Sequence, residues 1–81
     1  MAKREKLKEK LLSGEHDNNF DFNELCTVLL HLQFTERKGK GSHRIFTRQG
    51  VEEIINLQPA GKKAKPYQVR QVRQIVIGYS L

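Results

Sequence analysis

The order of the periodic segments constrains the fold most strongly. Two stretches with a helical apolar period flank a middle stretch, residues 33–58, that is rich in β-branched and aromatic residues and divided by glycines. The second helix is predicted to begin at Pro66, which suits the first position of a helix because it has no N–H to satisfy. The stripes predicted to be buried are Phe22, Leu25, Cys26, Leu29 and Leu32 in the first helix, and Val69, Val72, Ile75 and Val76 in the second.

The middle stretch predicts three strands, at residues 33–38, 42–47 and 51–58, because Gly39-Lys40-Gly41 and Arg48-Gln49-Gly50 interrupt it. Two amphipathic helices bury their stripes most economically by packing together on one face of a sheet. We therefore predict an α+β two-layer sandwich of helix, three-stranded antiparallel sheet and helix. The other face of the sheet is left to solvent or a ligand.

Local signals indicate where the two helices begin and end and which residues connect the last strand to the last helix. Gly78 is predicted to stop the last helix, and residues 59–65 are predicted to form a basic loop. At the start of the first helix, Asp21 and Glu24 have the spacing of a capping box, in which two side chains satisfy free N–H groups reciprocally.

The N-terminal residues allow two interpretations. Leu7 and Leu11 are spaced for an optional extra helix over residues 1–13, but the apolar stripe is narrow and a frayed basic tail is the alternative. Turn-forming residues follow. The predicted organisation is therefore a basic N-terminal extension and linker, residues 1–19, and a single domain, residues 20–81.

Length and composition exclude several classes of protein. A chain of 81 residues buries only ~60–65% of its unfolded surface, so a large catalytic cleft is not expected. We see no signal peptide and no apolar run near the ~20 residues of a membrane span, so we expect a cytoplasmic protein with no membrane partner. The single cysteine, Cys26, provides neither an intramolecular disulfide nor a metal cluster, and we expect no metal and no cofactor.

Charge is distributed unevenly along the chain. The net charge is +3 over residues 1–10, −4 over residues 11–34 and +7 over residues 35–81, giving +6 in total. An excess of cations in one contiguous half favours binding to a polyanion, most simply nucleic acid.

One short segment stands out for its chemistry. His43 begins a predicted strand and follows Gly39-Lys40-Gly41-Ser42. The cations Lys38, Lys40, Arg44 and Arg48 all lie within six residues of it. RNA carries its own nucleophile, the 2′-hydroxyl, so an imidazole that exchanges a proton near neutral pH can promote cleavage without a metal. The plainer interpretation is that the histidine is structural and that the lysines only solvate an edge strand.

A resemblance to a known family rests on residues in a fixed order over residues 21–77. They are Phe34, then Gly41-Ser42-His43 with Phe46 three residues later, Gly50, Pro59, and Pro66 before Val69-Arg70-Gln71-Val72. In this order and spacing the chain resembles the HicA-type toxins, the mRNA interferases of bacterial toxin–antitoxin pairs.

The resemblance implies a fold like the double-stranded-RNA-binding domain, a toxin that cleaves mRNA through His43, and a HicB-type antitoxin that covers the site. We also expect the toxin itself to be monomeric. The chain departs from the family pattern twice. Many relatives have glycine where Gln33 stands, so the first helix must end without the usual left-handed glycine. Many also have a second histidine where Ala60 follows Pro59.

The sequence and the resemblance allow three functions. The first is a metal-independent endoribonuclease with His43 as general acid/base, and the second is a non-catalytic RNA-binding module of the same fold. The third is a small regulator that inserts its last helix, with Arg70 and Arg73, into DNA. The residues predicted to bind RNA are Lys38, Lys40, Gly41, Ser42, Arg44, Arg48, Lys62, Lys63 and Lys65.

Overall fold

The computed structural model describes the backbone of residues 2–81 and the side chains of residues 5–81. The elements, in chain order, are α1 (Ala2–Ser13), a 3₁₀ turn η1 (Asp17–Asn19), α2 (Phe22–His31), β1 (Thr35–Lys38), β2 (Arg44–Arg48), β3 (Val51–Leu57), β4 (Pro59–Ala60), β5 (Lys63–Ala64) and α3 (Pro66–Gly78). The predicted α+β class and the helix, three-strand, helix order are confirmed. No helix within residues 2–81 combines the length and the apolarity needed to cross a membrane.

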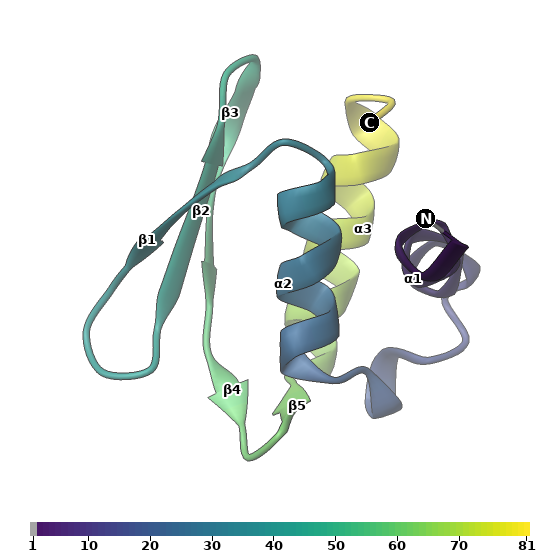
Figure 1. The fold of residues 1–81 in the computed structure, drawn as a ribbon, viewed down its shortest axis with the longest axis horizontal. Coiled ribbons are helices and arrows are strands. Elements are labelled where there is room, and N and C mark those ends of the chain that lie inside the picture. Colours follow the sequence, from purple (N-terminus) through teal and green to yellow (C-terminus); the bar gives the residue numbers. More distant parts are fainter. Residues whose placement is uncertain (1) are drawn as a thin grey trace.

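The larger sheet is an antiparallel meander in the order β1-β2-β3. Both α2 and α3 pack against one of its faces (Figure 1), as two amphipathic helices beside one sheet require. The first two strands begin two residues later than predicted, so Ser42 and His43 precede β2 and do not belong to it. The side chains of Arg44, Lys38 and Leu57 share a face because Arg44 pairs with both neighbouring strands at that level.

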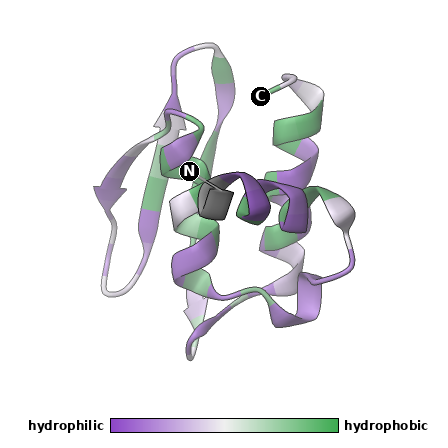
Figure 2. Cartoon of the chain, turned by 45° about the vertical axis from the view of Figure 1, so that its right-hand side comes forward, coloured by the Kyte–Doolittle hydropathy of each residue, from purple (hydrophilic) through white to green (hydrophobic). Residues whose placement is uncertain are grey.

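Helix α1 is well formed and adds a third layer. It crosses α2 and α3 on the side away from the sheet (Figures 1 and 2). Its Leu7 and Leu11 are buried in the same core as the other helices, which resolves the choice between helix and frayed tail in favour of the helix. Asp17 in η1 accepts two hydrogen bonds from Arg73 of α3, at 2.7 and 2.9 Å, and the Arg73 guanidinium also donates to the Leu11 carbonyl at 3.3 Å.

The core lies between the sheet and the helices. Phe46, Ile55 and Leu57 are fully buried on the inner face of the sheet, whereas Ile54 on the outer face is 64% exposed. The predicted helical stripes are buried except for Leu32 at the end of α2, which packs on the core while partly exposed. The outer face of the sheet therefore remains open, as predicted.

Helix α2 ends in a left-handed turn without glycine. Gln33 has φ 73°, its N–H donates to the Leu30 carbonyl at 3.1 Å, and the N–H of Phe34 donates to Leu29 at 3.0 Å. These two bonds define a Schellman motif, in which glycine usually occupies the left-handed position. Burial of Phe34 and a hydrogen bond from Arg48 Nε to the Leu32 carbonyl, at 2.9 Å, fasten the turn.

Helix α3 also ends in a left-handed turn without glycine. Gly78 is the last helical residue, so the helix stops where the sequence predicted, but Gly78 is not the residue in the left-handed conformation. The left-handed residue is Ser80, with φ 56°, and the N–H of Leu81 donates to the Val76 carbonyl at 3.0 Å. The helix closes after Gly78 because Leu81 folds back onto the core.

Residues 59–64, predicted as part of a loop, form a small hairpin instead. Strands β4 and β5 pair through Pro59 with Ala64 and Ala60 with Lys63, and Gly61 takes φ 64° in the two-residue turn. The hairpin is bonded to the segment before α2: Phe22 N–H donates to the Lys62 carbonyl at 3.0 Å, and Ala64 N–H donates to Phe20 at 2.8 Å. The start of α2 is thereby held against the hairpin.

This attachment also changes the cap of α2. Asp21 occupies the N-cap position, as predicted, but its carboxylate makes no bond to the helix N–H groups. It accepts a hydrogen bond from Lys63 Nζ at 2.9 Å instead. The predicted capping box is therefore wrong, because the hairpin draws the Asp21 side chain away from the helix end.

Candidate functional site

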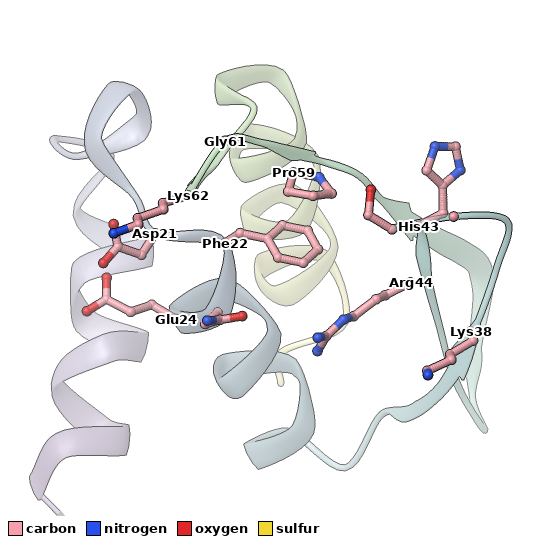
Figure 3. Close-up of a pocket in the computed structure, with 12 residues that line it drawn as sticks. Asp21, Phe22, Glu24, Lys38, His43, Arg44, Pro59, Gly61 and Lys62 are labelled. Atoms are coloured by element: carbon pink, nitrogen blue, oxygen red, sulfur yellow. The ribbon is translucent and has the colours of Figure 1, made fainter.

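An open pocket of about 700 Å³ lies where the start of α2, the β1–β2 connection and the β4–β5 hairpin meet (Figure 3). Three segments that are far apart in the sequence therefore form it. Its lining residues are Asp21, Phe22, Asn23, Glu24, Lys38, Gly41, Ser42, His43, Arg44, Pro59, Gly61 and Lys62.

The β1–β2 connection places His43 at the rim of this pocket. Gly39 N–H donates to the His43 carbonyl at 2.9 Å, and His43 N–H donates to the Lys40 carbonyl at 3.0 Å, so the backbone of His43 is held on both sides. A Cβ at position 39 would lie 3.0 Å from the Cβ of His43, so this close approach favours glycine. His43 is partly buried, and its ring points away from Phe22 and Arg44 (Figure 3).

Arg44 reaches into the pocket from the inner face of β2. Its guanidinium lies over the Phe22 ring, 5.7 Å from the ring centre, and its Nη1 is 3.3 Å from Glu36 Oε2 on β1. The side chain remains 41% exposed, so a ligand can reach it. An arginine held by a ring and a carboxylate loses little further freedom when it binds an anion.

Two lysines add positive charge at different ends of the pocket. Lys38 pairs with Arg44 across the sheet and lies on the same face. Lys62 is in the hairpin turn, where Figure 3 shows it beside Asp21, on the side opposite His43. The pocket therefore brings together Lys38, Arg44, Lys62 and His43, which favours an anionic ligand.

The structure places the remaining predicted RNA-binding residues in two groups. Gly41 and Ser42 line the pocket beside His43. The others lie outside the lining: Lys40 is exposed on the β1–β2 connection, Arg48 bonds the end of α2, Lys63 donates to Asn19 at 2.7 Å and to Asp21, and Lys65 donates to Gln58 Oε1 at 3.0 Å.

The carboxylates Asp21 and Glu24 were not predicted to be near the site, because their spacing indicated only a role in helix capping. The hydrogen bond from Lys63 and its charge hold the pKa of Asp21 below its usual value. Glu24 Oε1 is 2.9 Å from Lys10 Nζ of α1. Nothing in the local sequence links Asp21 to Lys63, 42 residues away, so only the unpredicted hairpin could have revealed this end of the pocket.

The pocket does not contain the cysteine. Cys26 is buried in the core on the next turn of α2, and burial raises the pKa of its thiol to about 11. Within residues 2–81, no three histidine, cysteine or carboxylate side chains are grouped so that they could hold one metal ion. The chemistry offered by the described part of the chain is an accessible imidazole among cations.

Fold and pocket together define a small basic α+β domain with a cationic, open site. The family model described as the HicA toxin of bacterial toxin–antitoxin pairs matches residues 22–76, from the first residue of α2 almost to the end of α3. The chain therefore belongs to the HicA toxin family. No curated protein and no solved structure matches it. Helix α1 and η1 lie outside the matched residues.

Proposed function

We propose that this toxin is a cytoplasmic, metal-independent endoribonuclease that cleaves mRNA, blocks translation, and uses His43 as its general acid/base. The observation that carries the proposal is the position of His43. Its imidazole is accessible at the rim of a pocket that also presents Arg44 and Lys38. Membership of the HicA toxin family supports the same assignment.

The chemistry needs only groups that the pocket supplies. His43 takes the proton of an RNA 2′-hydroxyl, the 2′-oxygen attacks the adjacent phosphorus, and the bond from phosphorus to the 5′-oxygen breaks. The departing 5′-oxygen takes a proton from solvent water in the open pocket and leaves as a hydroxyl. Arg44 and Lys38 offset the negative charge that grows on the phosphoryl oxygens. General acid–base catalysis of this kind contributes roughly 10²–10⁴-fold to the rate. The products carry a 2′,3′-cyclic phosphate or its hydrolysed form.

The test compares His43→Ala with the unmodified protein on a labelled RNA in a buffer that contains EDTA. We expect His43→Ala to lower the cleavage rate by at least ~100-fold. His16→Ala is the matched control, because His16 is an exposed histidine of the linker that does not line the pocket. Cleavage by His43→Ala at the unmodified rate would remove His43 from the mechanism.

Cleavage and binding measurements together separate the alternative functions. A non-catalytic RNA-binding module would show salt-dependent affinity for RNA and leave it intact after long incubation. A DNA reader would prefer duplex DNA in competition. Of the two arginines in that hypothesis, Arg73 is bonded to Asp17 and to the Leu11 carbonyl, which leaves Arg70 as the exposed one.

The proposed partner is a HicB-type antitoxin that inhibits a monomeric toxin by covering the pocket. A site with Lys38, His43 and Arg44 at its surface suits a partner that offers carboxylates to the Lys38–Arg44 segment. Occlusion of His43 in the toxin–antitoxin complex is the expected arrangement. A complex that leaves His43 open to solvent would contradict inhibition by simple blocking.

A further inference from the structure

Helix α1 reaches the site through the side chain of Lys10. Lys10 Nζ lies 2.9 Å from Glu24 Oε1, and Glu24 is in the first turn of α2, where it lines the pocket. Lys10 also lies over the Phe20 ring, 4.8 Å from its centre, so the ammonium group is fixed from two sides. A residue outside the family match thus contacts a wall of the pocket.

Both acids of the pocket have a cation that lies outside the pocket lining. Glu24 has Lys10, and Asp21 has Lys63 at 2.9 Å. In Figure 3 both carboxylates point away from His43 and Arg44. The two acids are therefore paired from behind, with cations outside the lining, and they do not pair with Lys38 or Arg44. Arg44 has Glu36 of β1 as its own acid and remains 41% exposed.

Removal of Lys10 would change this balance. The Glu24 side chain is 31% exposed, so without its partner it would be free to turn toward the pocket cations. A carboxylate near those cations competes with an RNA phosphate for them and also repels the phosphate. At an effective dielectric constant of ~20, one unit charge within several ångströms is enough to change the affinity for RNA measurably.

We propose that Lys10 is a positioning residue of the RNA site: it holds the Glu24 carboxylate against α1 and so keeps the pocket cationic. This inference rests on the proposed function, because it names RNA as the ligand. It makes α1 part of the binding site and not only a cover for the core.

The experiment measures affinity for a fluorescein-labelled, single-stranded RNA of mixed sequence in a His43→Ala background, where the probe is not cut. Lys10→Met keeps the aliphatic contact with Phe20 and removes the charge. We expect it to weaken binding ~3–10-fold when Glu24 is present, and less than ~2-fold when Glu24→Gln is also present. Lys10→Arg should bind as the parent does, because it keeps the charge.

Lys6→Met is the matched control, since Lys6 is an exposed lysine of the same helix that does not line the pocket. Two results would overturn the inference, because either would assign the effect to net charge. The first is that Lys6→Met weakens RNA binding as much as Lys10→Met does. The second is that Lys10→Met weakens RNA binding by the same factor whether position 24 is Glu or Gln. Circular dichroism of each variant verifies that the fold is intact. Failure of the parent itself to bind RNA would instead reject the proposed function, and this inference with it.

Discussion

At the scale of single residues, Gly39 determines where His43 stands. Its backbone bonds to His43, and a Cβ at position 39 would meet the Cβ of His43 at 3.0 Å and the Ile45 side chain at 3.4 Å. His43 would have to move by a few tenths of an ångström to accept a methyl group there. Small displacements of a catalytic group reduce the rate steeply because the reacting geometry is narrow.

We therefore expect Gly39→Ala to lower kcat/KM for RNA cleavage roughly tenfold while the protein stays folded. Gly78→Ala is the control, because a Cβ at that helical position meets nothing within 4 Å. Cleavage assays beside thermal melts give the measurement. A Gly39→Ala protein that cleaves at the unmodified rate would show that the turn does not set the position of His43.

At the scale of elements, an ion pair fastens the N-terminal extension to α3. Asp17 and Arg73 share two hydrogen bonds, and their side chains are only 15% and 17% exposed. The hydrogen bond from Arg73, more than any other contact, holds the pKa of Asp17 below its ordinary value of 3.8. A lowered pKa means that the folded state favours the ionised carboxylate, so this stabilisation is present above the unfolded pKa and is lost as the pH falls.

Asp17→Asn should lower the free energy of unfolding at pH 7 by ~1 kcal/mol. This value is at the upper end for ion pairs at a protein surface, because the pair of Asp17 and Arg73 is bidentate and partly buried. The difference between the two proteins should shrink as the pH falls below 3.8. Urea unfolding across that range measures it, with Glu15→Gln of the same linker as an exposed control. An equal difference at every pH would assign the effect to lost packing and not to charge.

Most elements could be predicted from the sequence because their apolar residues repeat with the period of a helix or strand. The helix ends were predicted only in part: the stop at Gly78 and the lack of a left-handed glycine after α2 were expected. The left-handed conformations of Gln33 and Ser80 were not, because side-chain preference disfavours them, and burial of Phe34 and packing of Leu81 stabilise the two turns. The β4–β5 hairpin was missed because its two-residue strands have no measurable alternation. Its stability comes from bonds to residues 20–22.

At the scale of the whole molecule, the reactivity of the Cys26 thiol shows whether the core is folded. Cys26 is 3% exposed on the inner face of α2, and burial raises the pKa of its thiol to about 11. The thiolate is the form that reacts with alkylating reagents. A folded chain at pH 8 therefore offers almost no reactive sulfur.

Alkylation of the native protein at about pH 8 should proceed at least ~100-fold more slowly than alkylation of the urea-unfolded protein. Mass spectrometry of timed samples measures both rates, and the unfolded protein is the internal control for reagent activity. Rapid labelling without urea would mean that α2 separates readily from the sheet, in conflict with the buried stripe of that helix.

The site was predictable on one side only. Local sequence places His43 among glycines and cations, and the structure puts His43, Lys38 and Arg44 around one pocket. The opposite wall of the pocket contains Asp21, Glu24 and Lys62. It forms because residues 20–22 contact residues 62–64, about 40 positions away, and neither periodicity nor a short motif reveals such contacts. Charge patterning alone therefore predicts a polyanion as the ligand but does not predict the shape of the site.

The bonds between residues 20–22 and 62–64 have a consequence for biosynthesis. A growing chain that ends near β3 already contains His43, but it lacks the hairpin that completes the pocket. The pocket can close only after residues 62–64 have been made, when the three-stranded sheet is already complete. If the proposed function holds, a nascent chain that ends at β3 carries His43 without a complete RNA site.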